Sequence, residues 1–237
     1  MAAKTVAVVQ SCYIPWKGYF DLINLVDEFI LFDDRQYTRR DWRNRNRIKT
    51  PQGTAWLTIP VEVKGRYHQR IDETRTQGLE WRERHWKGLA HNYRAAPWFE
   101  AYAGRFAPLY LDETETQLSR INRAFIAAAC DVLGIETTIS WSTDYPATGT
   151  RSDRLVSLCS AAGATDYLSG PAARAYLDEG LFAERDITIS YMDYSGYPAY
   201  EQLFPPFEHT VTVLDLIFNA GEQARKYMKS FPESLCP

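Results

Sequence analysis

Two short apolar segments near the start of the chain constrain its fold most strongly: Thr5–Gln10 (TVAVVQ) and Glu28–Phe32 (EFILF). Both are rich in β-branched or aromatic residues without polar alternation, as is typical of strands buried on both faces of a parallel sheet. Pro15 and Gly18 interrupt the chain between them, and Tyr19–Asp27 has the apolar spacing of a helix. A strand, a turn, a helix and a strand in this order predict a right-handed βαβ unit.

The rest of the chain continues to alternate between helical and strand-like patterns. Gln117–Leu133 is the clearest amphipathic helix, and Gly134 is suited to end it. The other predicted strands are Ala55–Val63, Thr138–Trp141, Asp166–Ser169 and Ile187–Met192. The other predicted helices are Glu80–Tyr93, Trp98–Leu111, a segment from Ser152 to Cys159 that Gly163 closes, Pro171–Leu177 and Thr212–Met228. We therefore predict an α/β fold with a mostly parallel, Rossmann-like sheet flanked by helices and extra C-terminal α/β elements.

Length and composition favour one cytoplasmic domain over residues 1–237, with a loose tail at residues 230–237. Hydrophobic residues make up 45% of the chain, which is enough to bury a core without disulfides. No apolar run approaches the roughly 20 residues that span a bilayer, and the N-terminus lacks a secretory pattern, so we expect no membrane partner. The oligomeric state is left open. Scattered cysteines without CxxC spacing predict free thiols in a reducing compartment: Cys12, Cys130, Cys159 and Cys236.

Charge is distributed unevenly. Residues 35–49 hold seven basic side chains against the single acid Asp41, a local charge of +6 in a chain of net charge −3. Guanidinium groups suit bidentate binding of phosphate or carboxylate. A solvated charged strand is the alternative, but six arginines interleaved with asparagines and Trp42 favour phosphate recognition. The phosphate could belong to a nucleotide, a nucleotide sugar or RNA.

An extended conformation would divide this basic segment into two faces. Arg43, Arg45 and Arg47 would lie on one face of the strand. Asn44 and Asn46 would lie on the other face, where they could orient a substrate amide, a hydroxyl or a base edge.

The ends of the first two predicted strands are polar. Ligands of open α/β sheets bind beyond the carboxyl ends of the strands, so Gln10–Pro15 and Asp33–Asp34 should lie side by side and share one cleft with the arginines. Adjacent carboxylates of an extended chain point in different directions. We expect one of Asp33 and Asp34 to face the cleft as a general base, a cation ligand or an amine ligand, and the other to pair with an arginine. A turn or a salt bridge is the alternative.

Gln10–Tyr19 (QSCYIPWKGY) leads from a strand end into a helix N-terminus, where backbone N–H groups attract anions and Lys17 adds a positive charge. This segment resembles the PxxGH turn of class I nucleotidylyl-transferase folds, with Tyr19 in place of the histidine. Cys12 could have a lowered pKa there and act as a nucleophile, but a small buried residue at a turn is the favoured interpretation. Cys130 and Cys159 lie on apolar helix faces and should only pack.

The four histidines lack the spacing that metal ligands have in known motifs, so we predict no metal site. His85 and His209 stand among polar and aromatic residues and are the better acid/base candidates. No Walker A loop and no G-x-S-x-G motif occurs, and the sequence names no cofactor.

Several longer motifs resemble those of the WbqC-like protein family: QS-x-YIPWKGYFDLI, FDD-x-QYT-x-RDWRNRN-x-IKTPQG, WLTIPV, YHQ, YLSGPAA and DYSGYP…FEH…LDL-F-N-G. The resemblance extends from about Val6 to Met228. Relatives with this form of the first motif commonly carry Asn where this chain has Cys12, which argues further against a cysteine nucleophile. The matching positions are Gln10, Tyr13, Pro15, Trp16, Lys17, Gly18, Tyr19, Asp33, Asp34, Gln36, Arg40, Asp41, Asn44, Arg45, Asn46, Lys49, His68, His85, Ser169, Gly170, Tyr194 and His209.

The resemblance implies proteins of bacterial O-antigen, sugar and natural-product gene clusters that attach aminoacyl or related acyl groups to amines. We therefore predict an N-acyltransferase or aminoacyltransferase that forms an amide on an amine acceptor such as an amino sugar. Its donor would be a phosphate-bearing small molecule or an aminoacyl-tRNA. Asp33, Asp34 or a histidine would take the amine proton, and Asn44, Asn46 or helix-end N–H groups would stabilise the oxyanion.

Two other interpretations remain open at this point. One is an ATP-dependent ligase or nucleotidylyl transferase, with Mg²⁺ expected at Asp33 or Asp34. The other is a non-catalytic binding protein of a biosynthetic pathway.

Overall fold

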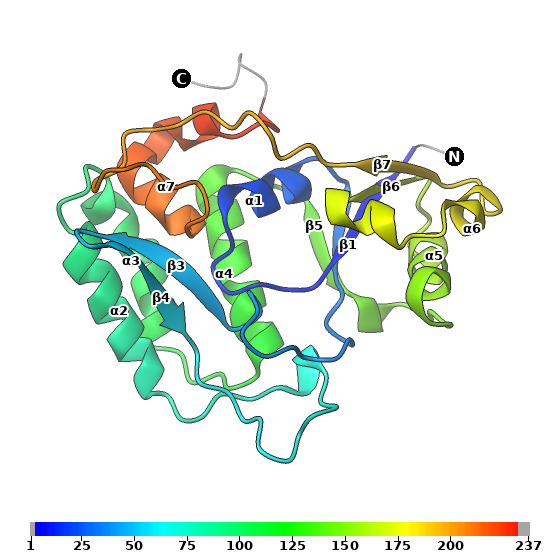
Figure 1. Ribbon diagram of the computed structural model, residues 1–237, viewed down its shortest axis with the longest axis horizontal. Coiled ribbons are helices and arrows are strands. Elements are labelled where there is room, and N and C mark those ends of the chain that lie inside the picture. Colours follow the sequence, from blue (N-terminus) through cyan, green and yellow to red (C-terminus); the bar gives the residue numbers. More distant parts are fainter. Residues whose placement is uncertain (1–2, 232–237) are drawn as a thin grey trace.

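The chain folds around a five-stranded sheet in which every pair of neighbouring strands is parallel. The computed structural model describes residues 3–231. The central strand is β1 (Thr5–Val9), with β2 (Glu28–Leu31) and β5 (Thr138–Trp141) on one side and β6 (Asp166–Ser169) and β7 (Thr188–Tyr191) on the other (Figure 1). The order β5-β2-β1-β6-β7 is that of a doubly wound sheet, with its topological switch point between β1 and β6.

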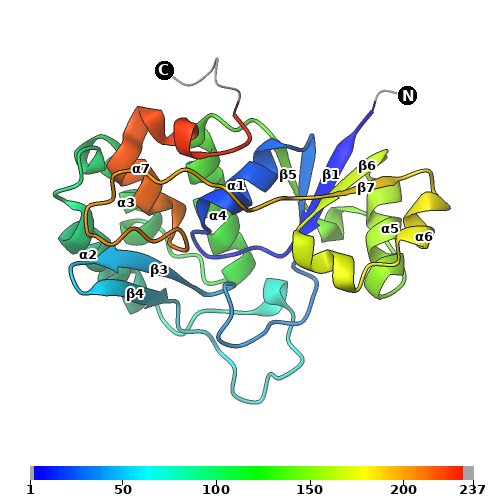
Figure 2. The ribbon, with the colours of Figure 1, turned by 45° about the horizontal axis from the view of Figure 1, so that its top comes forward.

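Helices cover both faces of this sheet. Helices α1 (Lys17–Asn24) and α4 (Leu118–Leu133) lie on one face, and α5 (Arg151–Ala161) and α6 (Glu179–Ala183) lie on the other (Figures 1 and 2). The strand side chains divide between two apolar clusters accordingly, since successive residues point to opposite faces. The cluster beneath α1 and α4 includes Ala7, Phe29 and Leu31, and the cluster beneath α5 and α6 includes Val6, Val8 and Ile30.

A long insertion between β2 and β5 builds a second part of the molecule beside the sheet. It contains the antiparallel hairpin β3 (Arg45–Thr50) and β4 (Gly53–Thr58), followed by α2 (Glu80–Tyr93) and α3 (Phe99–Leu111). Helix α7 (Val213–Ala220) returns from the C-terminal end to pack on α3 (Figure 1). The apolar core under α1 and α4 continues without interruption into this part. Short 3₁₀ turns complete the elements: Ile71–Glu73, Ser142–Asp144, Pro171–Ala175 and Gly221–Tyr227.

The predicted fold class is confirmed, while some predicted elements have different bounds. The strand predicted over Ala55–Val63 spans Gly53–Thr58; the Ile59 amide still donates to the Asn44 carbonyl at 2.8 Å, and Pro60, which has no N–H to donate, follows directly. The helix predicted over Thr212–Met228 is broken at Gly221, where φ is 53°. A Cβ there would lie 2.1 Å from the Trp98 indole, so only glycine fits. The helix predicted over Pro171–Leu177 is a 3₁₀ turn, and α6 was not predicted.

The C-terminal segment is anchored further than predicted. The Asp21 carboxylate of α1 accepts hydrogen bonds from the backbone amides of Lys229 and Ser230, so the predicted loose tail is held at its first residue. Residues 232–237 lie outside the described residues. Within residues 3–231, no helix is long and apolar enough to cross a membrane.

Phe218 joins α7 to the insertion and gives a test of the continuous core. It is fully buried, and its ring centroid lies 5.0 Å from that of Phe99 and 5.5 Å from that of Tyr93. Phe218→Ala should therefore lower the free energy of unfolding by about 3–5 kcal/mol in urea titrations. Leu111→Ala, at a position 52% exposed, is the control and should change it by less than about 0.5 kcal/mol. A loss below about 1 kcal/mol for Phe218→Ala would contradict this packing.

Candidate functional site

A cleft of about 1000 Å³ opens at the switch point, beyond the carboxyl ends of β1 and β6. Its walls come from the end of β1 up to Gln10, from the segment Ser169–Ala173 after β6, from the first turn of α5, and from the cleft-facing side of α1. Doubly wound proteins bind their ligands at this place, and the volume suits a ligand of nucleotide size.

The lining of this cleft is both cationic and aromatic. Arg35, Arg43 and Arg151 contribute to it, and none of the described residues that line it is acidic. Such walls favour a ligand that combines an anionic group with an apolar or aromatic part. The aromatic rings are those of Trp16, Tyr19, Phe32, Tyr167, Tyr176 and Tyr194.

Arg43 is held by the chain itself. Its Nη1 donates to the carbonyls of Gln10 (3.0 Å) and Ser11 (3.3 Å) and lies 3.0 Å from the Cys12 sulfur. The same Gln10 carbonyl accepts the Tyr19 hydroxyl at 3.1 Å. Arg43 therefore fixes the backbone at the end of β1 and adds its charge to the cleft from a set position.

The side chains of Arg35 and Arg151 differ in how many contacts they form with the rest of the protein. Arg35 donates to the Asp34 carboxylate at 3.0 Å and covers the Phe32 ring at 4.7 Å. Arg151 is exposed at the start of α5, and its side chain forms no hydrogen bond or ion pair with any residue described between 3 and 231. Its φ of 50° is uncommon for a residue other than glycine. Arg151 is therefore the lining arginine most available to a ligand.

The loop between β1 and α1 does not turn directly into the helix but crosses to the inserted hairpin. Ser11 N donates to the Asp33 carboxylate at 2.8 Å, and Tyr13 N donates to the Trp42 carbonyl at 3.0 Å. The Asn46 amide donates to the carbonyls of Tyr13 (3.1 Å) and Ile14 (2.8 Å). This loop is therefore fixed by backbone-directed hydrogen bonds on both sides.

Tyr13 carries the loop into the core of the insertion. Its hydroxyl lies 2.7 Å from the Tyr110 hydroxyl and 3.0 Å from His85 Nδ1, and all three side chains are buried. Burial, with a smaller contribution from the nearby Arg84 charge, lowers the pKa of His85 to about 4. The structure thus places His85, a predicted acid/base residue, on the buried face of α2 and not in the cleft lining.

The two aspartates after β2 also face inward. Asp33 is buried and accepts hydrogen bonds from Ser11 N and the Ser119 hydroxyl, and burial raises its pKa. Asp34 accepts hydrogen bonds from Arg154 (2.6 Å), Arg35 and Ser142. These contacts outweigh its partial burial and lower its pKa. The two carboxylates do point to different partners, as expected, but neither is among the residues that line the cleft.

The asparagines and lysines of the predicted site bond to the backbone. Asn44 donates to the Ile59 carbonyl at 2.8 Å, as Asn46 does to the β1–α1 loop. Lys49 is buried and donates to the Pro206 carbonyl at 2.5 Å. Lys17 donates to the Pro198 carbonyl at 2.9 Å, and burial lowers its pKa to about 8. All four side chains stabilise connections between segments that are distant in sequence.

The remaining predicted residues lie on the surface. Arg45 and Arg47 lie on the outer face of β3, and the Arg40 carbonyl accepts a hydrogen bond from Arg45. His68 and His209 are exposed, next to the rings of Tyr67 and Phe207 respectively. None of these side chains lines the cleft.

The predicted convergence of the first two strand ends is observed, but only part of the basic segment joins them. The cleft brings together these predicted residues: Gln10, Trp16, Tyr19, Gln36, Arg43, Ser169 and Tyr194. The prediction missed Arg151, Ser152, Tyr167, Pro171 and Tyr176, and it included Arg35 only as part of the basic segment. Arg151 and Ser152 follow the loop after a predicted strand and open a predicted helix, which was the available signal for them.

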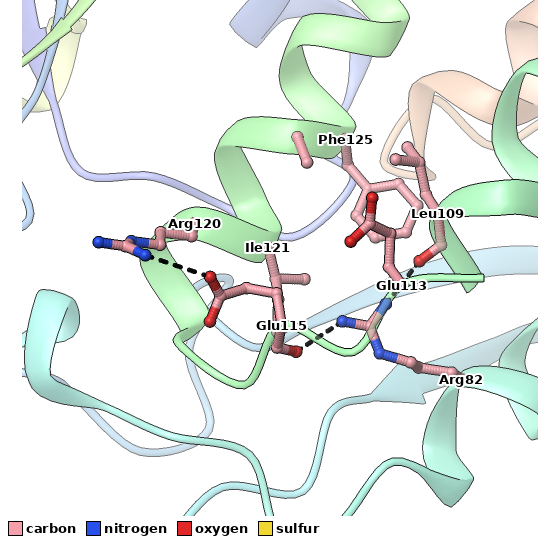
Figure 3. A pocket seen from close by; sticks show the side chains of 8 residues that line it. Arg82, Leu109, Glu113, Glu115, Arg120, Ile121 and Phe125 are labelled. Carbon is pink, nitrogen blue, oxygen red and sulfur yellow. Dashed lines mark hydrogen bonds and ion pairs between the residues drawn. The ribbon is translucent and has the colours of Figure 1, made fainter. Parts of the chain in front are cut away.

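A smaller pocket of about 200 Å³ lies near the N-terminal end of α4 and shares no lining residue with the cleft. Figure 3 shows Arg82 donating to the carbonyls of Leu109 (2.5 Å) and Glu115 (2.6 Å). The Glu115 side chain pairs with Arg120 at 3.5 Å in the same view. Two of the lining arginines are therefore engaged by the protein itself, Arg82 with backbone carbonyls and Arg120 with Glu115.

The chain is thus an α/β protein with a doubly wound sheet and a cationic, aromatic cleft at its switch point. The model of the WbqC-like protein family matches residues 10–227, and the chain belongs to this family. It is 53% identical, over 95% of its own length and 98% of the relative's length, to Uncharacterized protein Rv1507c of Mycobacterium tuberculosis. No solved structure matches the chain significantly.

His85 provides a pH test of this geometry. Its pKa is about 4 in the folded protein and 6.5 when unperturbed, so the unfolded chain binds the proton first as the pH falls. The neutral imidazole therefore favours folding above pH 6.5, and on the order of 3 kcal/mol should be lost between pH 6.5 and pH 4. Urea titrations should show that His85→Gln loses less stability than the wild type over this range. Equal losses, or an NMR-measured pKa near 6.5, would contradict the placement.

Cys12 provides a reactivity test. Burial raises the pKa of its thiol to about 11, and this outweighs the favourable charge of Arg43. The thiolate is the reactive form, so native Cys12 should be alkylated by iodoacetamide at pH 7.5 much more slowly than a free cysteine. Peptide mass spectrometry measures the reaction, with the urea-unfolded protein as the fully reactive control. Rapid alkylation of Cys12 in the native protein would show an activated thiol instead.

Proposed function

We propose that this protein is an N-acyltransferase or aminoacyltransferase that binds a phosphate-bearing donor in the switch-point cleft and transfers its acyl group to an amine. One observation carries the proposal: Arg35, Arg43 and Arg151 meet aromatic walls in a cleft with no acidic side chain among the described lining residues. That lining is complementary to an activated acyl donor, whose phosphate is anionic and whose carried group is less polar.

The free groups of the cleft suggest how the donor is held. Arg151 offers a fork of N–H donors to a phosphate, and the N-terminus of α5 adds a favourable dipole beside it. The Gln10 side-chain amide forms no hydrogen bond with any residue between 3 and 231, so it can orient a carbonyl. Tyr176, 71% exposed, lies at the rim and can cover a bound ring.

In the proposed reaction, the amine nitrogen attacks the donor carbonyl carbon. A C–N bond forms, the bond between the carbonyl carbon and the donor oxygen breaks, and that oxygen leaves with the electron pair. The proton lost by nitrogen passes to water or to the leaving oxygen, because no carboxylate or imidazole occurs among the described lining residues. The contribution of the protein is then mainly orientation of the two substrates. We place this reaction in the cytoplasm, where dispersed free thiols such as Cys130 and Cys159 persist.

A second candidate, an ATP-dependent ligase or nucleotidylyl transferase, is favoured by the strand order. The order β5-β2-β1-β6-β7 is the mononucleotide-binding arrangement, and α1 starts two residues after Pro15 near the switch point. Against it, Asp33 and Asp34 are engaged with protein partners, and no group of three or more potential metal ligands occurs within residues 3–231.

One experiment separates these functions. The protein is mixed with amino-sugar nucleotides and either pre-activated donors (aminoacyl adenylates and aminoacyl-tRNAs) or the free acid with ATP, and products are followed by mass spectrometry. Amide formation from an activated donor without ATP supports the transferase. Amide formation that needs ATP, with release of pyrophosphate, supports the ligase. Ligand binding without any product would identify a non-catalytic binding protein and overturn the proposal.

Arg151→Gln tests the anion-binding role directly. The substitution removes a charged donor from the cleft, so binding of ADP measured by isothermal titration calorimetry should weaken by about tenfold or more. Arg105→Gln, at an exposed arginine of α3 outside the cleft lining, is the matched control and should leave binding unchanged. Equal affinities for wild type and Arg151→Gln would remove Arg151 from the site.

A further inference from the structure

Two tryptophans lie side by side on the surface of the hairpin. Trp42 is 40% exposed and Trp56 is 45% exposed, and their ring centroids are 5.4 Å apart. Single exposed apolar residues are ordinary, but two adjacent exposed indoles form a contiguous apolar surface of the kind that marks interaction sites.

Two arginines stand on the same face as the indoles. Arg47 is the cross-strand partner of Trp56, so their side chains lie on the same face of the hairpin. Arg45 lies two residues before Arg47 in β3, and its side chain therefore points to this face as well. The Arg45 guanidinium carbon lies 4.2 Å from the Trp56 ring centroid, and that of Arg47 lies 5.7 Å from it. We call Trp42, Arg45, Arg47 and Trp56 the Trp–Arg face.

No carboxylate of residues 3–231 contacts the two arginines of this face directly, although the Asp41 charge acts on Arg45 and the Glu208 charge acts on Arg47 from further away. Neither Arg45 nor Arg47 forms an ion pair with a carboxylate in the described part of the chain, and the Nε atoms of both are buried without a hydrogen-bond partner. The neighbouring Asp41 is engaged by the Thr38 hydroxyl and by Trp42 N, both at 2.7 Å. Glu208 likewise accepts hydrogen bonds from Thr210, so both guanidinium groups stay free of direct contact with the described carboxylates and available to an anionic partner.

We propose that the Trp–Arg face binds single-stranded nucleic acid. Unpaired bases stack on exposed indoles regardless of sequence, and guanidinium groups contact the phosphates between them. Bases in a duplex are already stacked and cannot use such a platform. A proline-rich peptide could also pack on paired indoles, but it would leave the two arginine charges without a complementary group.

The face is continuous with the cleft. Trp42 lines an apolar pocket of about 210 Å³ together with Cys12, Trp16 and Tyr19. Trp16 and Tyr19 also line the switch-point cleft. A strand bound on the face can therefore direct its end toward the cleft. That the end of the nucleic acid points toward the cleft rests on the proposed function, whereas the binding of nucleic acid to the face does not.

The test is fluorescence anisotropy with labelled ten-nucleotide oligo(U), oligo(dT) and a duplex of the same length. Wild-type protein should bind both single strands, and the duplex should bind at least about tenfold more weakly. Trp42→Ala and Trp56→Ala should each weaken single-strand binding by about fivefold or more, and Trp42→Phe should retain most of it. The double variant Arg45→Gln/Arg47→Gln should reduce the slope of log affinity against log salt concentration. Tighter binding of oligo(U) than of oligo(dT) would identify RNA, and not DNA, as the single-stranded nucleic acid that the face binds.

Controls keep the outcomes separate. Arg185→Gln, at an exposed arginine near the distant helix α6, should bind like the wild type. Circular dichroism verifies that each variant folds. Absence of oligonucleotide binding by the wild type, or equal binding by the tryptophan variants, would overturn the inference. So would a loss of self-association or of proline-rich peptide binding in the variants, since either would assign the face to a protein partner. Strand binding without amide formation would contradict only the proposed function.

Discussion

The fixed loop between β1 and α1 is the constraint on which the rest of the structure depends. In a simple doubly wound fold this connection is short and lies at the switch point. Here it leaves the sheet, buries Tyr13 against Tyr110 and His85, and is held by the Asn46 amide before α1 begins. The path of this one loop therefore connects the sheet to the insertion and leaves the switch point open as a cleft.

The same constraint explains why so many polar residues of the early motifs are buried. A loop that passes through the interior must have its N–H and C=O groups satisfied by side chains, because it forms neither helix nor sheet. Asp33, Arg43 and Asn46 supply these hydrogen bonds. Leaving a buried partner unsatisfied costs about 1–3 kcal/mol, so such side chains are tied to the fold, and of the three only Arg43 also contributes to the cleft lining.

The fold was predictable from the sequence where local patterns decide it. Apolar runs predicted the strands of the parallel sheet, and helical spacing predicted Glu80–Tyr93 with the bounds that are observed. Gly18 was seen only as a chain breaker. The structure adds that a Cβ there would lie 2.4 Å from the Trp16 ring, which explains the absence of a side chain. The break at Gly221 depends on contact with Trp98, more than a hundred residues away, and no local pattern can reveal it.

The site was predictable only in part, for a similar reason. Strand ends meet at one edge by topology, so Gln10 could be anticipated, whereas Ser169 was predicted only through the family resemblance. Residue type alone could not tell whether an asparagine or arginine faces a ligand or the backbone of a distant loop. Asn44 and Asn46 bond to the backbone, while Arg45 and Arg47 turn outward to the hairpin surface.

A crystal structure of the protein soaked with a nucleotide sugar tests the central claim most directly, namely that the excursion of the β1–α1 loop leaves a ligand site between β1 and β6. Ligand density is expected in that cleft, with a phosphate oxygen within hydrogen-bond distance of Arg151 and the loop unmoved. Density in the pocket beside Arg82 alone, or a loop that swings back to fill the switch point, would contradict it.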